Sequence, residues 1–270
     1  MKPLSKTRAA ILSIFLIAAF ATPQEARSAD PKPAPCGVGF VQQFQPQSLF
    51  QRASLRLADV PAGHVRVTFI GHSTFFIETS GGASVATDYN GFNVPPTIPD
   101  AVTMNRSHST HYTDAVDPAI KHALTGWDPD GGIIRHHVQI KDLRIYNLPT
   151  NIFGTTNGNS VFVFEAGGIC LAHLGHLHHY LSKEEIAQLG RIDVLFVPAD
   201  GSVTLSYEEA MYIIDQIKPR LVIPMHYGSG GFAQAVGARY PVKQQDASTV
   251  VLNRASLPMS TEVLILGGYF

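Results

Sequence analysis

The residues from Val65 to Thr79 read VRVTFIGHSTFFIET, and this stretch decides the fold. Val, Ile, Phe and Thr favour β-strands, so we expect one strand at 65–70 and a second at 74–78. Two successive glycines at positions 81 and 82 then mark a turn before a third strand at 83–87. Neighbouring strands joined by such short turns predict an antiparallel meander.

The chain continues with apolar runs that have the length and composition of further strands. Two runs, at 194–197 and 221–224, are apolar throughout, which is typical of strands buried on both faces. Helices are expected at 182–189 and 206–217, because each begins with a Ser-x-x-Glu capping box. A meander followed by alternating strands and helices predicts an α/β fold in which helices cover the outer faces of two mixed sheets. The other predicted strands lie at 143–148, 160–166 and 169–172.

The composition of the 270 residues is that of a globular protein, with 45% hydrophobic and 15% charged residues. Lys and Arg number 20 against 21 for Asp and Glu, which gives a formal net charge of -1. A balance so close to zero provides no basic footprint for nucleic acid or for anionic lipid. We therefore expect no nucleic-acid partner and, in the mature protein, no membrane partner, while the oligomeric state stays open.

The N-terminus has the pattern of a secretory signal peptide, which we assign to residues 1–28. Basic residues precede an apolar run at 9–21 that is too short to cross a bilayer. The small-x-small cleavage site that ends at Ser28 is preferred over an earlier one that ends the apolar run. We expect a Pro- and Gln-rich extension at 29–62, a folded domain at 63–270, and a periplasmic or secreted protein.

The two cysteines, Cys36 and Cys170, leave two possibilities open. An oxidising compartment would permit a disulfide between them. Cys170, however, lies inside the apolar run 169–172, where a cysteine acts as a small hydrophobic residue. We favour unpaired cysteines.

His and Asp residues follow the predicted strands at the points where those strands end. The carboxyl ends of strands in an open α/β sheet share one edge, so loops there bring side chains from distant segments together. A further pair, His108 and His111, lies in the polar segment 104–114. The residues at the strand ends are His72, Asp88, His173, His176, Asp200 and His226.

Histidine is abundant in this chain, with twelve copies. Neutral imidazole is a common ligand of zinc and similar divalent ions, and a closed site needs about four donors. Isolated histidines such as His64 and His122 are more simply explained as surface residues. The histidines for which we favour a metal site over a non-metal role are His108, His111, His176 and His226.

The order of these segments resembles that of the metallo-β-lactamase superfamily, and within it the UlaG-like branch of metal-dependent hydrolases. The resemblance covers roughly residues 63–230 and implies a four-layer αββα sandwich with a metal site at the sheet edges. Members of this family usually hold two zinc or manganese ions and a bridging hydroxide that attacks an ester or amide. The segments that carry the resemblance are VTFIGHSTFFIE at 67–78, TD at 87–88, AHLG at 172–175, DVLFVP at 193–198 and IPMHY at 223–227.

The chain departs from the family's central H-x-H-x-D-H motif, which aligns with residues 106–111. Arg106 stands where the family has its first histidine, and Thr110 where it has its aspartate. The family's bridging aspartate aligns with His176, and no histidine stands at the family's third position near 149–152. With these changes the resemblance implies one divalent ion, zinc or alternatively manganese, in place of two. The implied ligands are His108, His111, His176 and His226.

The same alignment suggests roles for residues around that ion. His108 would bind the ion or orient water, Arg106 would bind an anionic group of the substrate, and Asp114 would replace the missing aspartate if its loop turned inward. Asp88 or Asp200 could orient a ligand imidazole through its other ring nitrogen, or could simply cap a turn. The complete set assigned to an outer shell is His72, Asp88, His173 and Asp200.

Two functions are consistent with these patterns, both with a small-molecule partner. The first is an exported hydrolase in which a metal-bound hydroxide attacks a small ester, amide, lactone or phosphodiester. The second is a periplasmic protein that binds a metal ion or small ligand on a hydrolase fold without turnover, which the missing aspartates favour. His176, introduced where an oxygen donor disappears, favours the hydrolase, and the fold alone decides neither.

Overall fold

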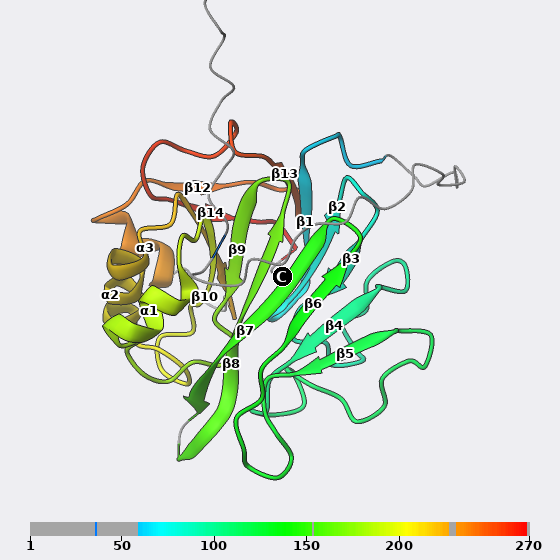
Figure 1. The fold of residues 1–270 in the computed structure, drawn as a ribbon. Coiled ribbons are helices and arrows are strands. Elements are labelled where there is room, and N and C mark those ends of the chain that lie inside the picture. The colour runs from blue at the N-terminus through cyan, green and yellow to red at the C-terminus, as the bar shows by residue number, and fades with distance from the viewer. Residues whose placement is uncertain (1–35, 37–58, 153, 227–230, 269–270) are drawn as a thin grey trace, which may run out of the picture. The chain divides into compact units, whose positions relative to one another are not determined.

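The structure, a computed structural model, describes residues 36, 59–152, 154–226 and 231–268, all within the unit Ala34–Phe270 (Figure 1). The signal peptide predicted at 1–28 and most of the extension predicted at 29–62 lie outside the described residues. In the part of the chain that is described, every helix is too short or too polar to cross a membrane.

The first sheet has six strands in the order β13-β1-β2-β3-β4-β5. β1, β2 and β3 pair antiparallel, which confirms the predicted meander, and β4 and β5 are added in parallel. Side chains alternate along β1, so Val65, Val67 and Phe69 are buried while the residues between them are half-buried. The strands are β1 (Val65–Gly71), β2 (Thr74–Thr79), β3 (Ser84–Ala86), β4 (Ala101–Met104), β5 (His122–Thr125) and β13 (Thr249–Leu252).

The second sheet has eight strands in the order β12-β14-β11-β10-β9-β8-β7-β6. β10 pairs in parallel with both β9 and β11, and all residues of these strands are buried. Burial on both faces explains why their sequences are continuously apolar rather than alternating. The strands are β6 (His137–Ile140), β7 (Leu143–Ile152), β8 (Thr155–Ala166), β9 (Ile169–His173), β10 (Val194–Pro198), β11 (Leu221–Met225), β12 (Val242–Gln244) and β14 (Glu262–Ile265).

The described helices pack against the eight-stranded sheet, α1 on β7, α2 on β10 and α3 on β12, and Figure 1 shows them side by side. α1 (Lys183–Leu189) and α2 (Tyr207–Ile217) begin at the predicted capping boxes. In each box the hydroxyl of Ser182 or Ser206 accepts the backbone N–H of the glutamate three residues later. The sequence did not predict α3 (Gly231–Gly237).

The core lies between the two sheets. Phe75 of β2 and Phe196 of β10 come from different sheets, and their ring centroids are 4.5 Å apart. Both side chains are fully buried, and burial of each contributes about 1.5–3 kcal/mol. Where β1, β10 and β11 end, buried polar residues replace this apolar packing, among them Ser73, Asp88 and His111.

Cys36 and Cys170 form a disulfide, which corrects the expectation of unpaired cysteines. Their Cα atoms lie 6.0 Å apart although 134 residues separate them along the chain. Both are buried in the main hydrophobic cluster, and Nη2 of Arg144 donates to the carbonyl oxygen of Cys36 at 3.1 Å. The apolar neighbours of Cys170 misled the expectation because a half-cystine is as compatible with an apolar core as a free thiol.

Candidate metal centre

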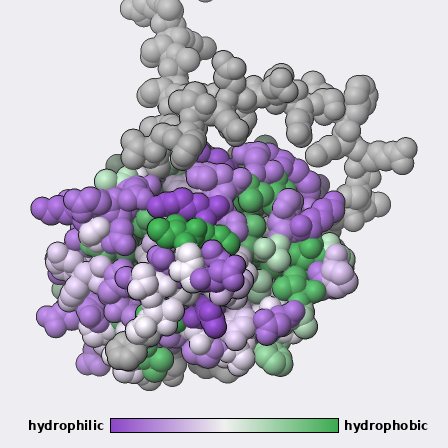
Figure 2. All heavy atoms as spheres, turned by 60° about the horizontal axis from the view of Figure 1, so that its bottom comes forward, coloured by the Kyte–Doolittle hydropathy of each residue, from purple (hydrophilic) through white to green (hydrophobic). Residues whose placement is uncertain are grey.

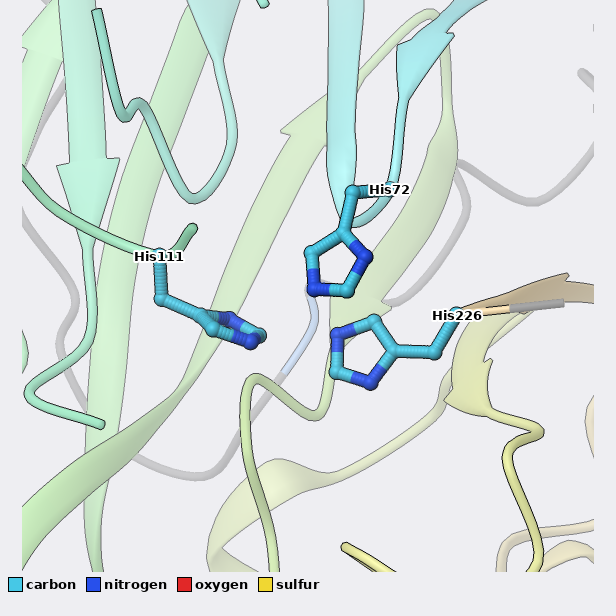
Figure 3. Close-up of side chains that lie close together, drawn as sticks. All are labelled: His72, His111 and His226. Carbon is cyan, nitrogen blue, oxygen red and sulfur yellow. The ribbon is translucent and has the colours of Figure 1, made fainter. Parts of the chain in front are cut away.

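Three histidine side chains converge where strands of both sheets end. His72 follows the last residue of β1, His226 follows the last residue of β11, and His111 lies in the segment between β4 and β5. Figure 3 shows the three rings gathered around one space. One ligand atom from each ring lies within 4.8 Å of the ligand atoms of the other two.

The Nε2 atoms of His72, His111 and His226 are buried and have no hydrogen-bond partner among the described residues. A buried polar atom left unpaired costs about 1–3 kcal/mol, so such atoms are rare without a reason. Three of them in one place match the needs of a divalent cation, which takes lone pairs from neutral imidazoles. The residues at this position therefore fit a metal ion.

Two of these histidines and a neighbouring aspartate have left-handed backbone conformations. φ is 54° at His72, 39° at Asp88 and 56° at His226. A non-glycine residue in this region costs about 1–2 kcal/mol, and such strain concentrates at functional sites. Half of the six described non-glycine residues with positive φ thus lie at this one site, where a sharp turn follows the preceding strand.

His111 is fully buried, and its outer ring nitrogen is held by a carboxylate. Nδ1 of His111 lies 2.6 Å from Oδ2 of Asp88 and 3.2 Å from Oγ of Ser73. An ionised carboxylate only accepts, so with Asp88 ionised Nδ1 carries the proton and Nε2 keeps its lone pair. Burial raises the pKa of Asp88, while the charge of His173 and a hydrogen bond from Asn105 oppose that shift. Asp88 thus makes the orienting contact that the sequence suggested for it.

Asp200 makes a similar contact with His226. Its Oδ2 lies 3.3 Å from Nδ1 of His226, and its Oδ1 accepts the backbone N–H groups of Ser202, Val203 and Thr204 at 3.0, 2.6 and 3.0 Å. Burial alone would raise the pKa of Asp200, but the hydrogen bonds from His226, Thr204 and Ser202 hold it well below its usual range. Asp200 is therefore ionised and leaves the Nε2 lone pair of His226 free.

A second group of possible ligands, made of His108, His111 and His176, shares His111 with the first. The Nε2 atoms of His108 and His176 are 3.2 Å apart. Two nitrogens bound to one tetrahedral zinc ion at about 2.0–2.1 Å would be separated by about 3.3 Å. Their outer nitrogens contact Oγ1 of Thr110 and Nε2 of His178, each at 2.7 Å.

His111 can offer only Nε2 to a metal, because its Nδ1 is engaged by Asp88. The two overlapping groups are therefore one set of neighbouring donors rather than two independent sites. We call this set the histidine cluster, made of His72, His108, His111, His176 and His226.

Burial keeps His72, His111, His176 and His226 neutral at neutral pH. It lowers the pKa of His72 to about 4, with the charges of His226 and His108 adding to the effect. It lowers the pKa of His111 and of His176 to about 2, again with neighbouring histidines contributing. Burial also lowers the pKa of His226, although the hydrogen bond to Asp200 opposes it. Neutral rings are the form that binds metal.

His173 and His72, both assigned to an outer shell, occupy different places. His173 has no free nitrogen, because Nε2 donates to the carbonyl of Ser73 at 2.9 Å and Nδ1 accepts the N–H of Gly175 at 3.1 Å. It therefore supports Ser73, whose hydroxyl contacts His111. His72 instead presents a free Nε2 inside the cluster, which is the place of a possible ligand.

Arg106 and Asp114, for which the sequence suggested roles around the ion, both lie at the surface. Arg106 is exposed and forms no hydrogen bond or ion pair with another described residue. Asp114 is also exposed, so its loop does not turn the carboxylate inward to replace the missing aspartate. Water solvates both charges, and neither needs a partner within the protein.

Sequence reasoning missed three supporting residues, Ser73, Asn105 and His178. Ser73 contacts His111, and Asn105 contacts Asp88, in both cases between segments distant in the chain. His178 contacts His176 because the loop that carries both folds back on itself. The position of His72 did carry a signal, because it follows β1 as His226 follows β11.

Sequence comparison gives a family match and two distant relatives. The family described as Beta-lactamase superfamily domain matches residues 66–226, more than half of the chain. A UPF0173 protein from Pyrococcus abyssi is 24% identical over 202 residues, which cover 67% of this chain and 92% of that protein. A UPF0173 metal-dependent hydrolase from Carboxydothermus hydrogenoformans is 24% identical over 196 residues, covering 61% and 85%.

Solved structures resemble the fold over most of the chain. A candidate Zn-dependent hydrolase of the metallo-β-lactamase superfamily from Thermotoga maritima has a TM-score of 0.56 and 24% identity, covering 75% of this chain and 98% of its own. Igni18, a metallo hydrolase from Ignicoccus hospitalis, has a TM-score of 0.52 and 20% identity, covering 70% and 99%. With two mixed sheets of this type and a family match that reaches from β1 to His226, this chain belongs to the metallo-β-lactamase superfamily.

Proposed function

We propose that this protein is a metal-dependent hydrolase of a small ester, amide, lactone or phosphodiester. The observation that carries the proposal is the set of buried Nε2 atoms of His72, His111 and His226, which lack partners among the described residues. Neutral nitrogens with free lone pairs are what a divalent ion requires of its ligands. The metal-dependent hydrolase among the sequence relatives supports the same conclusion.

The proposed ion is a single zinc, with manganese as the alternative. An all-nitrogen set suits zinc better than manganese, which prefers oxygen ligands. His72, His111 and His226 would hold it, and three protein ligands leave a coordination position open, as in catalytic zinc sites. His108 and His176, which the sequence also nominated, lie beside this set and share His111 with it.

A bound ion of this kind lowers the pKa of water and polarises the bond to be cleaved, which supplies a nucleophile at neutral pH. The contribution of the chain is orientation. Asp88 and Asp200 engage the Nδ1 atoms of His111 and His226, so that both Nε2 lone pairs remain available. His108 is the exposed member of the cluster, and Oγ1 of Thr110 contacts its Nδ1 at 2.7 Å.

The turn that carries Phe92 favours a substrate with an apolar group near its scissile bond. Phe92 is 80% exposed, so its ring is available for an apolar contact. Its backbone N–H donates to the side chain of Asn90 at 2.9 Å, and Asn90 in turn donates to the carbonyl of Thr110 at 2.8 Å. The turn is thus fixed to the residue that precedes His111.

Val203 lies in a second turn, one that is hydrogen-bonded to Asp200. It is 60% exposed, and its backbone N–H donates at 2.6 Å to Asp200, the partner of His226. Figure 2 shows hydrophobic patches within a mostly hydrophilic surface on the face that comes forward from the bottom of Figure 1. Exposed apolar side chains on two turns that are hydrogen-bonded to the surroundings of the histidine cluster support a substrate that carries an apolar group.

Export to the periplasm or the medium is part of the proposal. The disulfide between Cys36 and Cys170 supports it, because disulfides persist in oxidising compartments and are rare in the cytosol. The charge and apolar pattern of residues 1–28 supports the same destination.

One observation favours a second function, that of a periplasmic metal- or ligand-binding protein. Neither group of possible ligands among the described residues contains a carboxylate, and Asp114 is exposed. A free carboxylate would take the proton from an attacking water, whereas Asp88 and Asp200 are both engaged by histidines. This arrangement weakens turnover more than binding.

Metal analysis of untagged protein, followed by a hydrolysis panel, separates these functions. We expect about one zinc per chain after equilibration and washing, loss of zinc in His226→Ala, and retention in the control His122→Ala. Chelator-sensitive cleavage of an ester, amide, lactone or phosphodiester supports the hydrolase. Bound zinc without turnover of any of these favours the binding protein, and a folded protein that binds neither zinc nor manganese overturns the hydrolase.

A further inference from the structure

Asn105 connects the two sheets at the edge of the histidine cluster. It follows the last residue of β4 and is fully buried. Its Nδ2 donates to Oδ1 of Asp88 at 3.0 Å, and its Oδ1 accepts the backbone N–H of Ser160 in β8 at 2.8 Å. Its own backbone N–H donates to the carbonyl oxygen of His111 at 3.3 Å. One residue therefore contacts the opposite sheet, the carboxylate that orients His111, and the backbone of His111.

We propose that Asn105 is a positioning residue that sets the orientation of His111 as a metal ligand. The inference rests on the proposed function, since it takes His111 to bind the ion. Oδ2 of Asp88 contacts the ring of His111, and Asn105 holds the other oxygen of the same carboxylate. With both oxygens engaged the carboxylate cannot rotate, and the ring that it holds is fixed as well.

The amide of Asn105 can do this in only one orientation. Its NH₂ group must face Asp88, because an ionised carboxylate only accepts hydrogen bonds. Its oxygen must face the N–H of Ser160, which only donates. A reversed amide would place oxygen against oxygen and N–H against N–H, so the two partners together determine the direction of the side chain.

Two glycines leave space for this amide and no more. A Cβ atom added at Gly126 would lie 2.2 Å from Oδ1 of Asn105, and one added at Gly175 would lie 2.3 Å from its Nδ2. Gly175 has a φ of +60° and directly precedes His176, so the loop that carries His176 also packs against Asn105. Any side chain at either glycine would displace the amide.

Asn105→Asp separates the positioning contact from the structural one. The variant keeps an oxygen for the N–H of Ser160, but it loses the donor to Asp88 and sets two carboxylates against each other. Asn105→Ala loses both contacts. If Asn105→Ala does not fold, Asn105→Asp still decides, because it keeps the size of the side chain and the bond to β8.

Asn147→Ala is the matched control. Asn147 is also buried, donates to the carbonyl of Ile134 at 3.1 Å and to Oγ of Ser160 at 2.8 Å, and accepts the N–H of His136 at 2.6 Å. Its side chain makes three hydrogen bonds, against two for that of Asn105. Both residues contact Ser160, but the partners of Asn147 include no cluster histidine and neither of the two orienting aspartates. A loss of packing or of hydrogen bonds in general would therefore affect both positions alike.

The test measures zinc affinity by chelator competition, the absorption spectrum of the cobalt-substituted protein, and urea unfolding of the metal-free protein. We expect Asn105→Asp and Asn105→Ala to bind zinc about 10- to 100-fold more weakly than the unmodified protein. Their cobalt spectra should change because one ligand is misplaced. Asn147→Ala should unfold at a lower urea concentration but bind zinc and cobalt as the unmodified protein does.

A charge swap supplies a rescue that a purely structural role would not show. In the double variant Asp88→Asn with Asn105→Asp, the new amide donates to the new carboxylate, which still accepts the N–H of Ser160. We expect tighter zinc binding than in Asn105→Asp alone. Asn105→Asp that folds, binds zinc with unchanged affinity and keeps the cobalt spectrum overturns the inference while leaving the proposed function intact. Failure of the unmodified protein to bind zinc overturns both.

Discussion

The imidazole rings of His72 and His226 are stacked, with centroids 4.2 Å apart and planes 12° from parallel. The backbone N–H of His226 also donates to the carbonyl oxygen of His72 at 3.1 Å. This hydrogen bond joins the end of β1 in one sheet to the end of β11 in the other. The two rings are therefore held in place by the backbone as well as by their own contact.

Replacing His72 should weaken zinc binding more than replacing His176. Nε2 of His72 has no other partner among the described residues, whereas Nε2 of His176 contacts His108. We expect the zinc affinity of His72→Ala and of His226→Ala, measured by chelator competition, to fall by orders of magnitude. Zinc that is retained in His72→Ala and lost in His176→Ala would place the ion among His108, His111 and His176 instead.

The protein should be more stable with glycine than with alanine at position 72. His72 has a φ of 54°, where glycine is unstrained and alanine is not. In the metal-free protein we expect His72→Gly to exceed His72→Ala by about 1 kcal/mol in free energy of unfolding, measured in urea. At His122, in strand β5, the same pair should have the opposite order, because glycine weakens a strand. Equal free energies of unfolding for His72→Gly and His72→Ala would contradict backbone strain at this position.

The metal-free protein should lose stability as the pH falls below about 6.5. In the folded protein the pKa of His72 is about 4 and that of His176 about 2, against 6.5 for an unperturbed histidine. Below pH 6.5 the unfolded chain binds protons that the folded chain does not, so the free energy of unfolding falls; above it these groups contribute no further change. Urea unfolding with chelator at several pH values measures the slope.

The slope of the free energy of unfolding between about pH 7 and pH 5, compared between variants, assigns this effect to the cluster. His176→Gln removes one depressed pKa and should make the slope shallower. His122→Ala, outside the cluster, should leave it unchanged. A free energy of unfolding that stays constant over this range would contradict the neutral, buried state of the cluster.

Phe92→Ser should raise KM for apolar esters while leaving kcat nearly unchanged, because Phe92 would contact the substrate equally in the ground and transition states. Steady-state kinetics with esters of increasing chain length measure the effect. Met259, which is 94% exposed and lies between β13 and β14, provides the control Met259→Ser. Unchanged KM in Phe92→Ser would remove this turn from substrate binding.

Local sequence patterns predict much of the fold. The alternation in β1, the continuous apolar runs of β10 and β11, and the Ser-x-x-Glu boxes of α1 and α2 each depend on residues a few positions apart, so sequence predicts them. The order of strands and helices predicted two mixed sheets, and the structure confirms them. The helix α3 follows no comparable local signal and was missed.

By itself the sequence determined which residue types stand at the strand ends, because His72, Asp88, Asp200 and His226 directly follow apolar runs. Only the tertiary structure decided how they are used. A lone pair is free for a metal only if no other group satisfies it, and that depends on contacts between distant segments: they leave Nε2 of His72 open and saturate both nitrogens of His173. The disulfide was decided in the same way, because 6.0 Å between the Cα atoms of residues 134 positions apart is a property of the folded core.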